Sequence, residues 1–199
     1  MRETAKLIIV LLLICAVATA LLGYVNSVTA GPIAELKIVE AREARMQVMS
    51  QADDISEQID DTKMGEIINA IGSSPEELNE IYVAKAADGQ IIGYTIKVTK
   101  NGFGGKIEVL VGINNDGKIN EVRILSHSET PGLGANSIKE DFYGRYRDKP
   151  ATGSLSVIKS GAPTDEQIIS ITGATITSKA VTDAVNIAIS AFAELTKGE

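Results

Sequence analysis

The sequence predicts an α+β domain, an antiparallel sheet packed by helices, behind one N-terminal transmembrane helix. Three observations carry this prediction. An uncharged apolar run lies near the N-terminus, strand-like segments break at Asp-Gly pairs, and the C-terminus has an amphipathic helical pattern. Strands followed by a helix that packs on them are typical of the α+β class.

The apolar run, Leu7–Val25, contains no charged residue. About 20 apolar residues are enough to cross the hydrocarbon core of a bilayer as a helix. Arg2 and Lys6 precede the run, so the positive-inside rule places the N-terminus in the cytoplasm. We therefore expect residues 1–30 to form a short cytoplasmic N-terminus and a membrane span at about 7–25. The alternative is a signal peptide, cleaved after Val28-Thr29-Ala30.

Composition excludes several kinds of site. The chain has 26 acidic and 19 basic residues and a formal net charge of -7, which argues against nucleic acid as a partner because phosphate binding needs clustered Lys and Arg. It has one cysteine, Cys15, and one histidine, His127. A disulfide framework and a Cys- or His-based metal centre are therefore not expected. A hydrogen-bonding role is preferred for His127.

Residues 31–80 are expected to form a helical connector. Glu35–Ala52 is charged and amphipathic, and a second short helix is expected around Met64–Ile71. Several residues roughly mark the apolar side of the first of these helices: Leu36, Val39, Ala44, Val48 and Met49.

Residues 81–199 are expected to form the α+β domain. From Ile81 to His127 the apolar residues alternate, and the pattern breaks at Asp88-Gly89, at Gly102–Gly105 and at Asp116-Gly117. Asp-Gly pairs between alternating segments indicate hairpin turns. The sequence thus predicts an antiparallel meander of four strands. Residues 155–159 are expected to add a further strand.

A long helix is expected at the C-terminal end of this domain. Apolar residues recur there at helical spacing, which predicts one buried face: Val181, Ala184, Val185, Ala188, Ile189 and Phe192. Thr177 or Ser178 is expected to cap this helix, which would place Thr175 just ahead of its N-terminus. Backbone N–H groups and the helix dipole favour an anion there. In the preceding segment, Asn136 or Ser137 is expected to cap a short helix that ends near Tyr146 and packs through it.

The motif Thr172-Gly173-Ala174-Thr175 resembles the S/T-G-A-T motif of the FMN-binding domain family. That family includes the G subunit of the Rnf electron-transport complex and the C subunit of the sodium-pumping NADH:quinone reductase. The resemblance implies that Thr175 carries FMN through a phosphoester bond. It also implies attachment by a separate magnesium-dependent flavin transferase, with FAD as the donor. Ile169 departs from the family pattern, in which an Asp often stands at this position.

A second segment, Glu129–Gly134, is similar to the E-T-P-G-L-G loop of the same family. The two motifs occur in the family's order, and the single N-terminal span resembles that of the Rnf G subunit. The resemblance implies a set of FMN-binding residues and no catalytic residue: Glu129, Thr130, Gly132, Leu133, Gly134, Thr172, Gly173, Ala174, Thr175 and Thr177.

The function that this resemblance implies is electron relay within an ion-translocating ferredoxin:NAD oxidoreductase complex of the cell (inner) membrane, with the C-terminal domain periplasmic or extracellular. The implied partners are other integral and peripheral subunits, the flavin transferase and membrane lipid. Alternatives are a membrane-anchored FMN-binding sensor, a C subunit of a sodium-pumping NADH:quinone reductase, and a binding module without cofactor.

Overall fold

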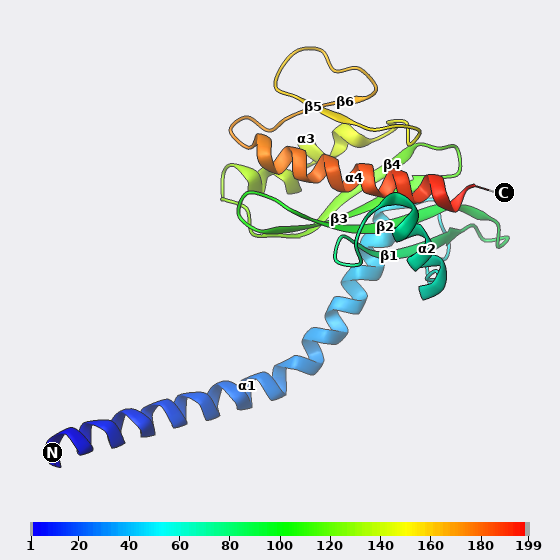
Figure 1. Cartoon of the computed structure of the whole chain (residues 1–199). Helices are drawn as coiled ribbons and strands as arrows, with labels where there is room; N and C mark the ends of the chain where they lie inside the picture. Colours follow the sequence, from blue (N-terminus) through cyan, green and yellow to red (C-terminus); the bar gives the residue numbers. More distant parts are fainter. Residues whose placement is uncertain (1, 198–199) are drawn as a thin grey trace. The chain divides into compact units, whose positions relative to one another are not determined.

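The computed structural model describes residues 2–197. The chain divides into two compact units between Arg42 and Glu43. The first unit is helical, and the second contains the sheet, whose strands and covering helices are labelled in Figure 1.

The first unit consists of most of helix α1 (Arg2–Val48). Within the described residues, this helix alone is long and apolar enough to cross a membrane, with a mean hydropathy of 2.8 in its most apolar window. No residue of that window is buried. The expected boundary between residues 30 and 31 is not a break in secondary structure, because α1 continues through Pro32.

The predicted apolar side of Glu35–Ala52 is correct only at its C-terminal end. Val48 and Met49 are buried, whereas Leu36 is 60% and Val39 is 52% exposed. The difference follows from the division of the chain, because Leu36 and Val39 belong to the first unit and Val48 and Met49 to the second.

The second unit is built on a four-stranded antiparallel sheet, as predicted. Its strands are β1 (Leu78–Lys85), β2 (Ile91–Asn101), β3 (Lys106–Asn114) and β4 (Ile119–His127), in the order β1-β2-β3-β4. Gly89 and Gly117 have φ values of 83° and 71° in the two predicted Asp-Gly turns, a backbone conformation that glycine adopts without steric cost. β1 begins at Leu78, ahead of the expected boundary at 81, and residues 43–80 belong to the same compact unit.

Different elements pack against the two faces of the sheet. Side chains alternate between these faces along every strand, so both faces carry apolar residues that need burial. One face packs against helix α2 (Asp61–Ile71) and helix α4 (Thr175–Leu195). α2 begins at Asp61 because Asp60 caps it by accepting the Lys63 N–H at 2.8 Å. All six apolar residues predicted for the buried face of the C-terminal helix are buried. On the other face, Val48, Met49 and Ile55 pack with Leu110.

The segment between β4 and α4 contains short elements only. They are the 3-10 helices η1 (Gly134–Ile138) and η2 (Gly144–Tyr146), helix α3 (Glu140–Tyr143), and the parallel pair β5 (Ser156–Ile158) and β6 (Gln167–Ile169). The expected helix cap at Asn136 or Ser137 is wrong, because both residues lie inside η1 and α3 begins after Lys139. Tyr146 does pack in the core, where its hydroxyl lies 2.7 Å from that of Thr182.

Candidate functional site

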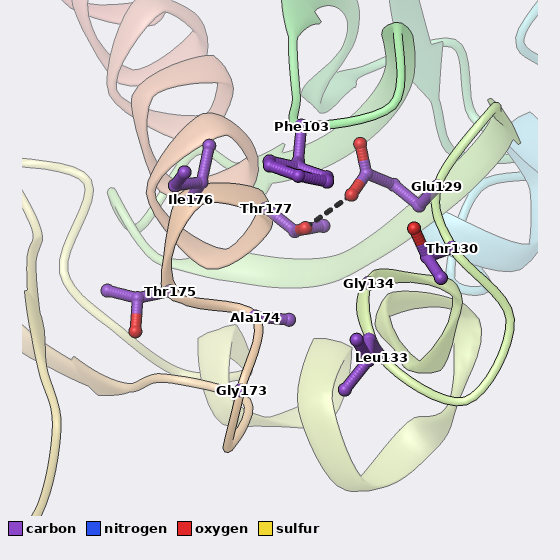
Figure 2. A pocket seen from close by; sticks show the side chains of 10 residues that line it. All are labelled: Phe103, Glu129, Thr130, Leu133, Gly134, Gly173, Ala174, Thr175, Ile176 and Thr177. Carbon is purple, nitrogen blue, oxygen red and sulfur yellow. Dashed lines mark hydrogen bonds between the residues drawn. The ribbon is translucent and has the colours of Figure 1, made fainter.

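A cavity of about 330 Å³ lies where three segments of the second unit meet (Figure 2). The loop after β2 contributes Phe103, and the start of α4 with the turn before it contributes residues 173–177. The segment after β4 contributes Glu129, Thr130, Leu133 and Gly134. The tertiary structure therefore brings both sequence motifs to one cavity. All predicted site residues line it except Thr172 and Gly132, and Phe103 and Ile176 line it in addition.

Helix α4 begins at Thr175, two residues before Thr177 and three before Ser178, the two expected caps. The capping residue is Ala174, which has no side-chain hydrogen bond to the helix. Thr177 and Ser178 lie inside the first turn, so the expected cap at either residue is wrong. The first N–H groups of a helix have no partner within it. These N–H groups of α4 lie at and beside Thr175, which lines the cavity.

The hydroxyl of Ser178 holds the turn that precedes the helix. It accepts a hydrogen bond from the Ile171 N–H at 2.9 Å and donates one to the Ala174 carbonyl at 3.0 Å. Gly173 has φ +77° within this turn, a left-handed conformation that glycine adopts without steric cost. The Ser178 side chain thus stabilises the turn that contains the motif. Because its hydroxyl makes these two bonds, Ser178 does not cap the helix.

The backbone before the motif is held by Arg145, from η2. Its guanidinium donates hydrogen bonds to the carbonyls of Ile169 and Ser170. The same side chain donates to the Asp141 carbonyl at 2.7 Å. Position 169, where the family often has Asp, is therefore fixed through its main chain, which does not depend on the side chain at that position.

Glu129 is buried, 6% exposed, and joins two other segments. One carboxylate oxygen accepts the Gly104 N–H at 2.8 Å. The other accepts the hydroxyl of Thr177, from the first turn of α4, as the dashed line in Figure 2 marks. The Glu129 side chain therefore links the loop after β2 to the start of α4, although Glu129 and Thr177 are 48 positions apart.

Exposed apolar side chains surround the cavity. Phe103 is 69%, Ile176 is 55% and Leu133 is 45% exposed, and Figure 2 shows Phe103 and Leu133 on different sides of it. Phe103 and Ile176 were not among the predicted site residues. The available signal for Phe103 was a large apolar side chain in a glycine-rich turn, where no core position is expected. Together, Phe103, Ile176 and Leu133 offer a planar, apolar ligand a hydrophobic surface to pack against.

Two predicted residues lie outside the cavity lining. Thr172 is exposed, and Gly132, with φ +78°, shapes the loop after β4, where its carbonyl accepts from Asn136 at 2.9 Å. His127 has the expected hydrogen-bonding role, since its Nδ1 accepts the Glu129 N–H at 3.2 Å. Within residues 2–197, no group of three or more His, Cys, Asp or Glu side chains is placed to hold a metal ion.

Comparisons with known proteins assign this region to a class. The family model described as the FMN-binding domain matches residues 102–190, a range that includes every residue lining the cavity. The solved structure of the C subunit of the Na⁺-translocating NADH-quinone reductase from Parabacteroides distasonis matches with a TM-score of 0.58 and 20% identity, over 79% of this chain and 93% of that one. At this identity the likeness establishes the fold. The second unit is thus an FMN-binding domain in class.

Two relatives show to which family of FMN-binding-domain proteins the whole chain belongs. The G subunit of the Na⁺-translocating ferredoxin:NAD⁺ oxidoreductase complex of Acetobacterium woodii is 38% identical over 96% of this chain and 93% of its own length. The G subunit of the ion-translocating oxidoreductase complex of Methanosarcina acetivorans is 32% identical over 94% of each chain. The chain belongs to the family of G subunits of ion-translocating oxidoreductase complexes.

Proposed function

We propose that this protein is the electron-relay subunit of a membrane-bound, ion-translocating ferredoxin:NAD⁺ oxidoreductase complex and carries FMN on Thr175. The family membership supports the complex, and the cavity beside Thr175 supports the site. FMN supplies one- or two-electron transfer when bound, while the protein binds and orients it. The protein is a redox component of a translocase and is not catalytic alone.

Thr175 is the hydroxyl best suited for attachment. Thr177 donates to Glu129 and Ser178 to the Ala174 carbonyl, so both hydroxyls are engaged within the protein. Among the described residues, the Thr175 side chain makes no hydrogen bond, and it lines the cavity. Thr172 is exposed outside the cavity lining. Within residues 172–178, Thr175 is thus the hydroxyl that lines the cavity without a hydrogen bond, and it is the first residue of α4. The other free hydroxyl of the lining, Thr130, is remote from this helix N-terminus in sequence, so the position of Thr175 at the start of α4 carries the assignment.

The residues around Thr175 fit both halves of FMN. A phosphodiester keeps a negative charge, which the N-terminal N–H groups of a 21-residue helix stabilise. The flavin ring is planar with apolar faces, and Phe103, Leu133 and Ile176 would pack against it and limit its contact with water. The backbone turn at Gly173 would keep Thr175 at the cavity edge.

Attachment requires a transferase and FAD as co-substrate. The Thr175 oxygen forms a bond to the FMN phosphorus, the bond between the two phosphates of FAD breaks, and AMP leaves. The hydroxyl proton passes to a base or to solvent. A covalent bond prevents loss of the cofactor from a domain on the outer side of a membrane, which is where the basic residues that precede Leu7–Val25 would place it.

The apolar part of α1 is proposed to anchor the protein in the cell (inner) membrane, in contact with lipid. The N-terminus would then be cytoplasmic and the second unit periplasmic or extracellular. A single transmembrane helix cannot enclose an ion pathway by itself. Ion movement is therefore assigned to other integral subunits, and electron supply and acceptance to redox centres on neighbouring subunits.

The C subunit of a sodium-pumping NADH:quinone reductase has the same fold. The relatives discriminate between the two assignments, because the G subunit of Acetobacterium woodii covers nearly the whole chain at 38% identity, against 20% for the structure of the C subunit. A separate regulatory role is not favoured by any described feature.

The test is co-production of the full chain with a flavin transferase, followed by denaturation, gel fluorescence and intact-mass measurement. Wild-type protein should keep flavin fluorescence after denaturation and gain the mass of FMN less one water. Thr175→Ala should lose both signals. Thr172→Ala removes a hydroxyl of the same motif outside the cavity lining and serves as the matched control, which should stay fluorescent.

Fluorescence that survives in Thr175→Ala and disappears in Thr172→Ala would assign the attachment site to Thr172. Wild-type protein that carries no covalent flavin would contradict the proposed chemistry. Flavin that is bound but released on denaturation would still support FMN binding in the cavity, but it would contradict the phosphoester bond.

A further inference from the structure

Glu129 is the one ionisable side chain among the described residues that line the cavity. It is 6% exposed, so its carboxylate is largely removed from water. Burying a charge is costly unless hydrogen bonds or a cation compensate it. The surroundings of this carboxylate therefore determine what effect it has on anything bound in the cavity.

Both carboxylate oxygens of Glu129 are acceptors, as in an ionised carboxylate. Their donors are the Gly104 N–H and the Thr177 hydroxyl, and both donors are neutral. Within residues 2–197, no Lys, Arg or His forms an ion pair with Glu129, although other carboxylates of the same domain, such as Glu121, do have a cation partner. The charge of Glu129 is thus held by dipoles and is not cancelled by a cation.

Three glycines allow the backbone to approach Glu129 and its neighbour Ser128 closely. A Cβ added at Gly102 would lie within 3.0 Å of one Glu129 oxygen. A Cβ added at Gly134 would lie within 3.0 Å of the other oxygen and of the Thr177 hydroxyl. A Cβ at Gly104 would meet the Ser128 carbonyl. The glycine-rich turn after β2 therefore fits closely around Glu129.

We propose that Glu129 is a positioning residue whose fixed negative charge lowers the reduction potential of the flavin in this cavity. The inference rests on the proposed function, since it concerns the cofactor assigned to Thr175. Reduction adds electron density to the flavin ring, and a nearby negative charge opposes that addition. Buried charges are screened less than exposed ones by water and salt.

The same contacts give Glu129 a second effect on the site. Because its carboxylate joins the loop that bears Phe103 to the first turn of α4, it keeps Phe103 and Thr175 on the same cavity. A neutral side chain of the same shape would preserve part of this link. Charge and position can therefore be separated experimentally.

The test uses full-length, FMN-loaded protein and a spectroscopic redox titration of the flavin. Glu129→Gln removes the charge and keeps the shape, and its amide oxygen can still accept the Gly104 N–H. We expect it to favour the reduced flavin by at least tenfold, which is a rise of about 30 mV for a two-electron couple. Glu66→Gln, an exposed residue on α2, removes the same formal charge elsewhere and should change this equilibrium less than about threefold.

A second variant distinguishes charge from shape. Glu129→Asp keeps the charge on a shorter side chain, so its flavin should be reduced at a potential close to that of wild type. Thermal unfolding followed by circular dichroism confirms that each variant is folded. A potential that rises equally in Glu129→Asp and Glu129→Gln would assign the effect to geometry and overturn the proposal.

The remaining outcomes of the titration also test the proposal. Folded, loaded Glu129→Gln with an unchanged potential contradicts this inference and leaves the proposed function standing. Loss of flavin from both Glu129 variants would make the residue necessary for attachment and would likewise overturn the redox role. Absence of flavin from wild-type protein is the failure of the proposed function itself.

Discussion

Asn186 of α4 and Leu155, just ahead of β5, exchange two hydrogen bonds. The Leu155 N–H donates to Asn186 Oδ1 at 2.7 Å, and Asn186 Nδ2 donates to the Leu155 carbonyl at 2.9 Å. The side-chain amide thus satisfies both main-chain groups of a buried residue. It ties the helix that begins at Thr175 to the segment that leads into the small parallel sheet.

Replacement of Asn186 tests this link. Asn186→Ala leaves the N–H and the carbonyl of Leu155 without their partners, so we expect the free energy of unfolding to fall by about 2 kcal/mol. The measurement is urea unfolding followed by circular dichroism. Ser190→Ala, an exposed residue one turn further along α4, should change stability by less than about 0.5 kcal/mol. Equal losses in both variants would assign the effect to the helix and not to the link.

Gly173 and Gly132 form a matched pair for the candidate site. Their φ values are +77° and +78°, so alanine at either position should cost about 1 kcal/mol or more of stability through backbone strain. Only Gly173 lines the cavity. We therefore expect Gly173→Ala to reduce covalent FMN incorporation well below that of Gly132→Ala, measured by gel fluorescence per folded protein. Equal incorporation in the two variants would show that the turn at Gly173 is not needed for attachment.

Gly112 allows the end of α1 to approach the sheet. A Cβ at this position would lie within 3.0 Å of the Val48 carbonyl, and that carbonyl is held by the side chain of Asn120 at 2.7 Å. Gly112→Ala should therefore destabilise the domain by about 1–3 kcal/mol in urea unfolding. Gly65→Ala is the control, because Gly65 lies in α2 with open space around it. It should instead stabilise by about 0.4–1 kcal/mol.

Arg147 compensates the buried carboxylate of Glu121. Two of its nitrogens donate to one Glu121 oxygen, and Glu140 accepts a further bond at 3.0 Å. Glu121 is 7% exposed. Arg147→Met leaves this carboxylate without a cation, and we expect a loss of about 1–3 kcal/mol in unfolding free energy. Lys197→Met removes an exposed ion pair with Glu194 and should have an effect below about 1 kcal/mol. A smaller loss in Arg147→Met than in Lys197→Met would contradict this assignment.

Burial raises the pKa of the Tyr146 hydroxyl above its ordinary value of 10.0. The unfolded chain therefore releases this proton at lower pH than the folded chain does. The stabilisation is fully present below pH 10 and is lost as the pH rises further. Tyr146→Phe should lose less stability than wild type between about pH 8 and about pH 11 in urea unfolding. At about pH 8 the variant should be less stable by about 1 kcal/mol, because the bond to Thr182 is missing. An identical pH dependence in both proteins would contradict this.

Several features could be predicted because they depend on local periodicity. The uncharged run Leu7–Val25 predicts an apolar helix by its length and composition, and it lies within α1. Strand alternation and the Asp88-Gly89 and Asp116-Gly117 turns predict the four-stranded meander, which is present. Helical spacing from Val181 to Phe192 predicts the buried face of α4. Each of these patterns is complete within one segment of chain.

Other features depend on which distant segments meet. Thr177 has the residue type of a helix cap, but its hydroxyl bonds to Glu129, and the helix begins at Thr175. Phe103 has no helical or strand periodicity that would assign it to a site, and it lines the cavity because its turn packs around Glu129.

The sequence by itself thus determined the class of fold, the apolar helix and the two motifs, because hydrophobic periodicity and turn chemistry are read over a few neighbouring residues. Only the tertiary structure decided which of the hydroxyls at the start of α4 stays free at the cavity and which are engaged. The bond between Glu129 and Thr177, which makes that choice, joins residues far apart in sequence, and no local pattern specifies such a partner.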